Sequence, residues 1–61
     1  MQNSDKTILI IEDDATLLQA MKLALTQLQF NVEEAFDGDQ GLKKSLELHP
    51  DMILLMGSMS R

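Results

Sequence analysis

The chain has 61 residues, so it can form one small domain, which at this size buries only about 60% of the surface exposed by the unfolded chain. It contains no cysteine, which excludes disulfides and thiolate metal sites and fits a reducing cytosol. Ten acidic residues against five basic ones oppose direct binding to nucleic acid or to an anionic membrane surface. The start is polar, unlike a signal peptide, and no apolar run could span a bilayer, so we expect a soluble, cytoplasmic domain.

The first predicted element follows a polar start, residues 1–5, which we expect to be a flexible tail. Residues 7–11 are a continuous apolar run rich in β-branched side chains, which is typical of a strand buried on both faces. The run ends in three acidic residues. The last of them, Asp14, is well suited to cap the N-terminus of a following helix, where acid also suits the helix dipole.

A helix and a more polar strand come next. Apolar residues at helical spacing predict a helix over residues 15–29. Residues 31–36 alternate in character, with Val32 on one face and Ala35 on the other, and their polarity favours an edge strand.

The second half of the chain repeats this helix and strand order. Asp37-Gly38 indicates a turn, and residues 39–48 then place Leu42 and Leu46 one turn apart on a helix. Gly41 weakens that helix by about 1 kcal/mol relative to alanine. The helix is expected to end at His49-Pro50, because a residue before proline is pushed away from helical geometry.

A second apolar run, residues 52–56, completes a β-α-β-α-β body at residues 6–56, and residues 57–61 form a small polar end. This order with short connections predicts an α/β fold with a parallel sheet and right-handed crossovers. Because two apolar strands flank a polar one in sequence, we expect the sheet order 2-1-3, with the first strand central.

Candidate chemistry gathers where strands one and three end. In open parallel sheets, ligands bind beyond the carboxyl ends of the strands, and here that edge would bring Glu12 and Asp13 close to residues 56–58. Clustered carboxylates favour a divalent cation, and a weak Mg²⁺ site is one interpretation. The other is that Asp13 and Asp14 simply cap the helix.

Three segments together resemble response-regulator receiver domains of two-component signalling: residues 6–14 with their acidic end, the Asp37-Gly38 turn, and Pro50 to Leu55. Their spacing matches the family as well. The resemblance covers nearly the whole chain but only the first half of the family's five-strand, flavodoxin-like domain. It implies a receiver-derived domain of a phosphorelay response regulator, with a histidine kinase as the partner of the parent protein.

The resemblance also implies roles for individual residues. Glu12 and Asp13 match the family's acidic pair, with Asp13 as a direct Mg²⁺ ligand and Glu12 acting nearby, and Ser58 stands where the family lends a backbone carbonyl to the metal. Met56 occupies the position of the phosphate-accepting aspartate, and a thioether offers neither charge nor an oxygen nucleophile. The hydroxyl residue and the lysine that contact the phosphoryl group belong to the family's second half. We therefore expect a domain that is not phosphorylatable in this form.

An alternative of a different class is an assembly module, natural or engineered, in which half of a doubly wound fold completes itself by dimerising. The third strand would expose an edge beside apolar side chains, and antiparallel pairing of Asp51 to Met56 in two chains would give one six-stranded sheet. Domain swapping is another way to close the same edge. A small enzyme is not expected, because no nucleophile and base pair is visible.

Overall fold

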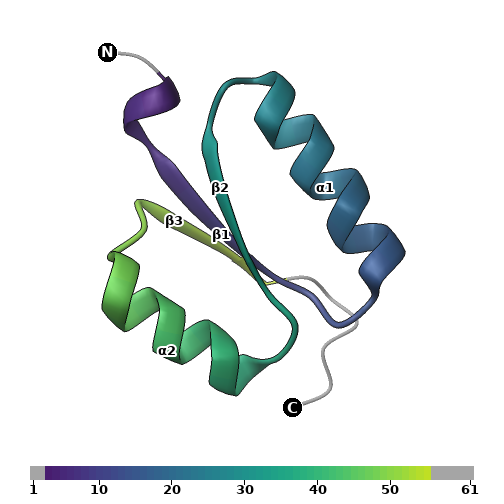
Figure 1. The fold of residues 1–61 in the computed structure, drawn as a ribbon, viewed down its shortest axis with the longest axis vertical. Helices are drawn as coiled ribbons and strands as arrows, with labels where there is room; N and C mark the ends of the chain where they lie inside the picture. Colours follow the sequence, from purple (N-terminus) through teal and green to yellow (C-terminus); the bar gives the residue numbers. More distant parts are fainter. Residues whose placement is uncertain (1–2, 56–61) are drawn as a thin grey trace.

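Three parallel strands form one sheet with a helix on each face in the computed structural model, which describes residues 3–55 (Figure 1). The elements in chain order are the short 3₁₀ helix η1 (Asn3–Asp5), β1 (Thr7–Ile11), α1 (Ala15–Gln27), β2 (Asn31–Ala35), α2 (Gly38–Leu48) and β3 (Met52–Leu55). The strand order is β2-β1-β3, with both neighbours parallel to β1. The predicted fold class and sheet order are confirmed.

The central strand β1 is buried because it has strand neighbours on both sides and helices on both faces. In its middle, Leu9 pairs with Glu33 of β2 and with Ile53 of β3. The side chains of Leu9 and Ile10 are completely buried. A run of apolar residues without polar alternation is what such a position requires.

The two faces of the sheet have separate cores, since successive side chains of a strand point to opposite faces. On the α1 face, Ile8 and Ile10 pack with Leu18 of the helix, and Val32 lies against this group. On the α2 face, the buried group is Leu9, Ile11 and Ala35. Val32 and Ala35 therefore lie on opposite faces of β2, as the alternation in the sequence predicts.

Helix α1 begins and ends through local hydrogen bonds. The Asp14 carboxylate accepts from the backbone N–H groups of Thr16 (2.9 Å) and Leu17 (3.2 Å), so the predicted N-cap is present. The helix ends two residues before the predicted boundary because Gln29 adopts a left-handed conformation (φ 72°). The N–H of Phe30 then reaches back to the carbonyl of Leu25, which is the hydrogen bond of a Schellman motif.

Helix α2 begins with a reciprocal pair of side-chain hydrogen bonds. Asp37 accepts from the N–H of Gln40, and the Gln40 side chain accepts from the N–H of Phe36, both at 2.8 Å. This arrangement resembles a capping box and supports the predicted turn. At the other end, His49 caps the helix in a left-handed conformation, directly before the proline.

The face that α2 turns to the sheet is built on a glycine. Gly41 is buried against Ile11, whereas Leu42 and Leu46 remain 61% and 66% exposed. The two leucines are one turn apart, as predicted, but they point away from the core of the described chain. The close approach at Gly41 fixes which side of the helix meets β1.

Over the part of the predicted tail that the structure describes, the chain forms a short helix. Asn3–Asp5 forms the 3₁₀ helix η1, and its side-chain and backbone groups bond to distant parts of the chain. The Asn3 amide donates to the carbonyl of Leu28 (2.6 Å), and the Asn31 amide donates to the carbonyl of Ser4. These two amides hold the segment against the β2 end of the sheet, which the polar composition alone does not reveal.

The strand end at Met56 and the polar end at residues 57–61 lie outside the described residues. Within residues 3–55, no helix combines the length and apolar character needed to cross a membrane.

Candidate functional site

The acidic turn after β1 occupies the carboxyl edge of the sheet. Ile11, the last residue of β1, pairs with Ala35 on one side and with Leu55 on the other, so Glu12 follows β1 where all three strands end. At this edge β1 continues into α1 on one face of the sheet, and β2 continues into α2 on the opposite face, so the two connections diverge. Open α/β sheets bind ligands at such a point.

Glu12 is buried and braces the turn. Its side chain has no exposed surface, its backbone N–H donates to the carbonyl of Ala35 (3.0 Å), and its Oε2 accepts from the N–H of Asp14 (2.8 Å). A buried carboxylate that accepts a backbone hydrogen bond holds the following residues in one geometry. Glu12 thus orients the turn from inside the protein.

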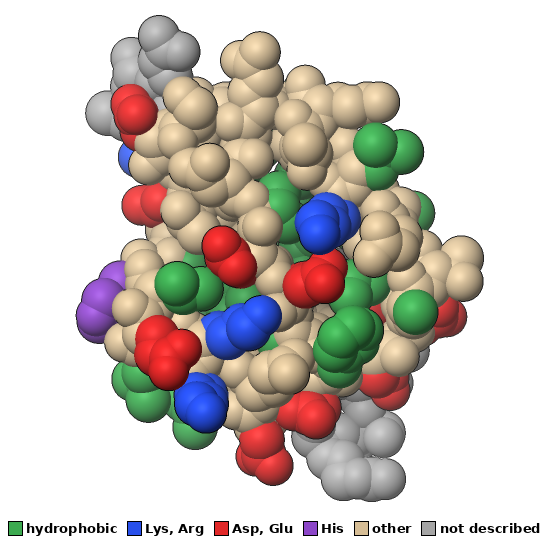
Figure 2. All heavy atoms as spheres, viewed as in Figure 1, with side chains coloured by type: hydrophobic (Ala, Val, Ile, Leu, Met, Phe, Trp, Pro, Cys, Tyr) green, Lys and Arg blue, Asp and Glu red, His purple; other side chains and the backbone are tan. Residues whose placement is uncertain are grey.

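Asp13 and Asp14 are exposed and have different tasks. Asp14 caps α1, which confirms the capping interpretation for this residue, whereas Asp13 lies on the surface of the turn between Glu12 and the cap. Acidic side chains gather along the edge of the molecule where β1 and β2 end (Figure 2). The turn therefore offers a carboxylate to the solvent at the edge where the strands end.

The structure unites part of the predicted site. Glu12 and Asp13 come together in one turn, next to the end of β3 at Leu55. Met56 and Ser58 lie outside the described residues. Within residues 3–55, no group of three or more His, Cys, Asp or Glu side chains is close enough to hold a metal ion. The two acids are hard oxygen donors, and Mg²⁺ sites often use only one or two carboxylates together with water, so the donor chemistry fits.

Comparison with known proteins identifies the family. The model of the response regulator receiver domain matches residues 8–61, which include the acidic turn, β2, β3 and all of β1 except its first residue. The chain belongs to this family. The sheet order and the buried acid after β1 are thus features of a receiver domain, and the resemblance noted in the sequence is confirmed at the level of the family.

Curated proteins that are similar to this receiver domain include response regulators. The response regulator ArlR of Staphylococcus aureus, in strains COL and USA300 among others, is 42% identical over 48 residues. The match covers 79% of this chain and 22% of the relative, so the chain corresponds to about a fifth of the length of the proteins that it resembles. No solved structure was found to match it.

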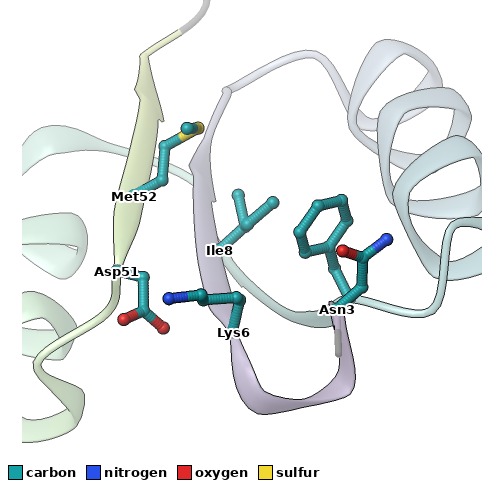
Figure 3. Close-up of a pocket in the computed structure, with 6 residues that line it drawn as sticks. Asn3, Lys6, Ile8, Asp51 and Met52 are labelled. Carbon is teal, nitrogen blue, oxygen red and sulfur yellow. The ribbon is translucent and has the colours of Figure 1, made fainter. Parts of the chain in front are cut away.

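The receiver domain also has a pocket at the opposite edge of the sheet, where the strands begin. Its volume is about 340 Å³, and the residues around it are Asn3, Lys6, Ile8, Phe30, Asp51 and Met52 (Figure 3). Sequence reasoning missed this pocket because its residues come from three separate stretches of the chain, 3–8, 30 and 51–52. The only local signal is Asp51, whose carboxylate accepts from the N–H of Thr7 (2.7 Å) and joins the start of β3 to β1.

Proposed function

We propose that this chain is a receiver domain of a two-component response regulator that does not accept phosphate in its present form. The observation that carries the proposal is Met56, which follows directly on β3 at the family's phosphate-accepting position. Ile11 and Leu55 are paired, which supports a placement of this position near the acidic turn.

The chemistry of phosphoryl transfer explains why a methionine is decisive. Aspartyl phosphorylation needs a carboxylate oxygen that attacks the phosphorus and charges that stabilise the transferring group. The thioether of Met56 has no ionisable oxygen, and no acyl phosphate can form on it. Glu12 is buried with one oxygen bonded to the turn, which makes it a poor replacement.

We also propose a weak Mg²⁺ site at the acidic turn. Asp13 supplies the direct carboxylate ligand, Glu12 orients the turn and acts nearby, and the backbone carbonyl of Ser58 is a second direct ligand. The exposed position of Asp13 supports this role. When bound, the metal would supply positive charge for phosphate oxygens.

The upstream partner of the parent protein would be a histidine kinase, as the family implies, and the domain would act in the cytoplasm. The relatives are named response regulators, which supports a signalling role. We do not propose a catalytic activity of its own.

The phosphate proposal is tested by incubating the chain with Mg²⁺ and a small acyl phosphate donor and measuring its mass. We expect no added phosphoryl group, while an intact receiver domain in a parallel tube is labelled. A stable, acid-labile adduct on this chain would contradict the proposal. Titration with Mg²⁺ alone, followed by NMR, tests the metal site: Asp13→Asn should abolish the shifts, and exposed Asp39→Asn should leave them unchanged.

We propose a second candidate function, assembly through β3 and the residue on either side of it (51–56). It is supported by a difference between the two sheet edges. On the β2 edge, Lys44 donates to the carbonyl of Glu34 (2.6 Å) and Lys22 pairs with the Glu34 carboxylate (3.4 Å). Lysines at a sheet edge discourage pairing with another chain. Within residues 3–55, β3 has a strand neighbour on one side only, and Ile53 and Leu55 are 46% and 66% exposed.

Self-association at this edge would bury those side chains and complete the backbone hydrogen bonding of β3. Small domains without disulfides often need such a gain. Sedimentation equilibrium tests the idea: we expect a homodimer at micromolar concentration. A folded monomer under those conditions would remove this candidate function and leave the signalling proposal untouched.

A further inference from the structure

The outer edge of β2 carries side chains of α2 at the place where a neighbouring strand would bond. We propose that Gln40 and Lys44 form a latch on this edge, which an extended peptide with basic side chains displaces when it adds to the sheet beside β2. The inference is independent of the proposed self-association, which uses the other edge of the sheet. Strands added beyond β3 in a longer chain would leave the β2 edge as it is.

The first step is to find which backbone groups of β2 point outward. The N–H of Asn31 and the carbonyl of Ala35 bond to the residues that flank β1, each at 3.0 Å, so the odd-numbered residues at both ends of β2 face β1. Backbone groups alternate in direction along a strand. The N–H and C=O groups of Val32 and Glu34 therefore point away from β1, and so does the N–H of Phe36.

Two of these outward groups are bonded to side chains of α2. The Glu34 carbonyl accepts from the Lys44 ammonium at 2.6 Å, and the Phe36 N–H donates to the Gln40 side chain at 2.8 Å. In a parallel strand pair, one residue of the neighbouring strand donates to one carbonyl and accepts from the N–H two residues further along. Lys44 and Gln40, one turn apart on α2, supply the same donor and the same acceptor. The latch therefore takes the place of one residue of a neighbouring strand.

The charges at this edge indicate which kind of strand can replace the latch. Successive side chains of β2 point to opposite faces, so Glu33 lies on the α2 face and Glu34 on the α1 face, where Lys22 pairs with its carboxylate (3.4 Å). Figure 2 shows lysine and acidic side chains interleaved in the region between the two helices of Figure 1. A strand beside β2 meets a carboxylate on each face of the sheet. A basic strand supplies both the backbone groups and the positive charge that the chain's own side chains supply in the latched state.

A second copy of the chain does not meet this requirement. Pairing two β2 strands brings two acidic strands together, and like charges opposite each other are destabilising. Each copy also carries a net charge of −5. The same charge attracts a basic peptide and speeds its encounter with the domain.

Part of the edge remains available for the first contact. The latch bonds reach only Glu34 and Phe36, so the outward groups of Val32 lie beyond them. Lys44 is only half-buried, and its ammonium can move into the solvent. Binding then exchanges the two latch bonds for two bonds to the peptide backbone and adds those of Val32. The added strand makes more hydrogen bonds than it displaces.

Two variants that remove the same charge test the latch. Lys43 and Lys44 are adjacent on α2, but Lys43 is exposed, whereas Lys44 bonds to β2. The probe is a short peptide of alternating valine and lysine, titrated into the isotope-labelled chain and followed by NMR. We expect shifts at the amides of Val32, Glu34 and Phe36. Lys44→Met should bind the peptide about tenfold more tightly than Lys43→Met, because the peptide no longer displaces a charge-assisted hydrogen bond.

Several results would overturn the inference. Equal affinities of the two variants would mean that Lys44 does not cover the edge. Equal binding of a peptide of alternating valine and glutamate would exclude a basic partner, and shifts confined to Ile53 and Leu55 would move the contact to β3. Dimerisation of Lys44→Met through β2 without peptide would make a second copy the partner instead.

Because Lys44→Met could weaken α2, the unmodified chain gives an independent result. The basic peptide should shift the β2 amides of this chain as well, and the shifts should shrink as salt screens the charges. No shift of these amides at the highest soluble peptide concentration would overturn the site.

Discussion

The contact between α2 and β1 at Gly41 allows a quantitative test of the packing. A Cβ atom added at Gly41 would lie 2.3 Å from Cδ1 and 2.8 Å from Cγ1 of Ile11. Both distances are shorter than side-chain carbons tolerate, so the Ile11 side chain or the helix must move. Gly41→Ala therefore opposes two effects: alanine favours the helix, and its methyl group overfills the space between helix and sheet.

The magnitudes decide the sign. Alanine gains about 1 kcal/mol over glycine in a helix interior. Overfilling a packed core costs about 1–3 kcal/mol. Ile11 is almost completely buried at the end of the central strand, which leaves its side chain little room to give way. We expect Gly41→Ala to lower the free energy of unfolding by about 1 kcal/mol, which corresponds to roughly 4–8 °C in Tm for a domain of this size.

A double-mutant cycle with Ile11→Val isolates the contact. Valine lacks the Cδ1 atom that makes the shortest contact, and the change alone should cost about 0.5–1.5 kcal/mol. In the Ile11→Val background, Gly41→Ala should be neutral or stabilising, because the helix preference remains while much of the overlap is gone. The expected coupling is about 1 kcal/mol.

The four chains are compared by urea unfolding followed by circular dichroism, at one fixed protein concentration so that self-association affects all of them alike. Two results would refute the reasoning. One is a stabilisation of about 1 kcal/mol by Gly41→Ala alone, as helix preference by itself predicts. The other is a cycle that is additive within about 0.5 kcal/mol, which would mean that the two side chains do not interfere.

Three further predictions concern the ends of elements and the charge of the chain. Asp14→Ala should destabilise the fold by about 1 kcal/mol in the same assay, while Asp14→Ser, which keeps a capping oxygen, should cost much less; equal losses would argue against the cap. Asn31→Ala should release Asn3–Asp5 and speed proteolysis near Ser4 severalfold, with exposed Asn3→Gln as a milder comparison; an unchanged cleavage rate would mean that the amide is not what holds the segment. Dimerisation should tighten as ionic strength rises to about 1 M, where screening shortens the reach of charge to about 3 Å, because each copy carries a net charge of −5. Weaker association at high salt in sedimentation runs would point to ion pairs at the interface.

The sequence predicts much of this fold because its strands differ clearly in polarity. The apolar run of β1 and the polar β2 select the order of the sheet, Asp14 marks the start of α1, and Asp37-Gly38 marks the turn before α2. What it does not predict depends on the backbone conformation of single residues or on contacts between distant segments. The left-handed Gln29 shortens α1, and the Asn3 and Asn31 amides turn an expected tail into a 3₁₀ helix.

In the candidate site as well, the sequence predicts some features and only the folded structure shows the others. The position of Glu12 and Asp13 at the end of the first strand follows from the pattern of the chain, whereas the complete burial of Glu12 depends on its hydrogen bonds within the folded turn. Likewise, the spacing of Leu42 and Leu46 predicts a helix face but not its orientation. That orientation is set by Gly41, whose missing side chain lets α2 approach Ile11.

The lysines on the β2 edge have a consequence for assembly size. Lys44 donates to the backbone carbonyl of Glu34, and Lys22 forms an ion pair with the Glu34 carboxylate. Glu34 belongs to β2, the edge strand that lies on the opposite side of β1 from β3. A sheet with two unpaired edge strands can add further chains without limit and grow into a fibre. A sheet with one protected edge strand stops after one further chain has paired with it. If the chain self-associates as proposed, these two ammonium groups, one from each helix, would limit the assembly to a finite size.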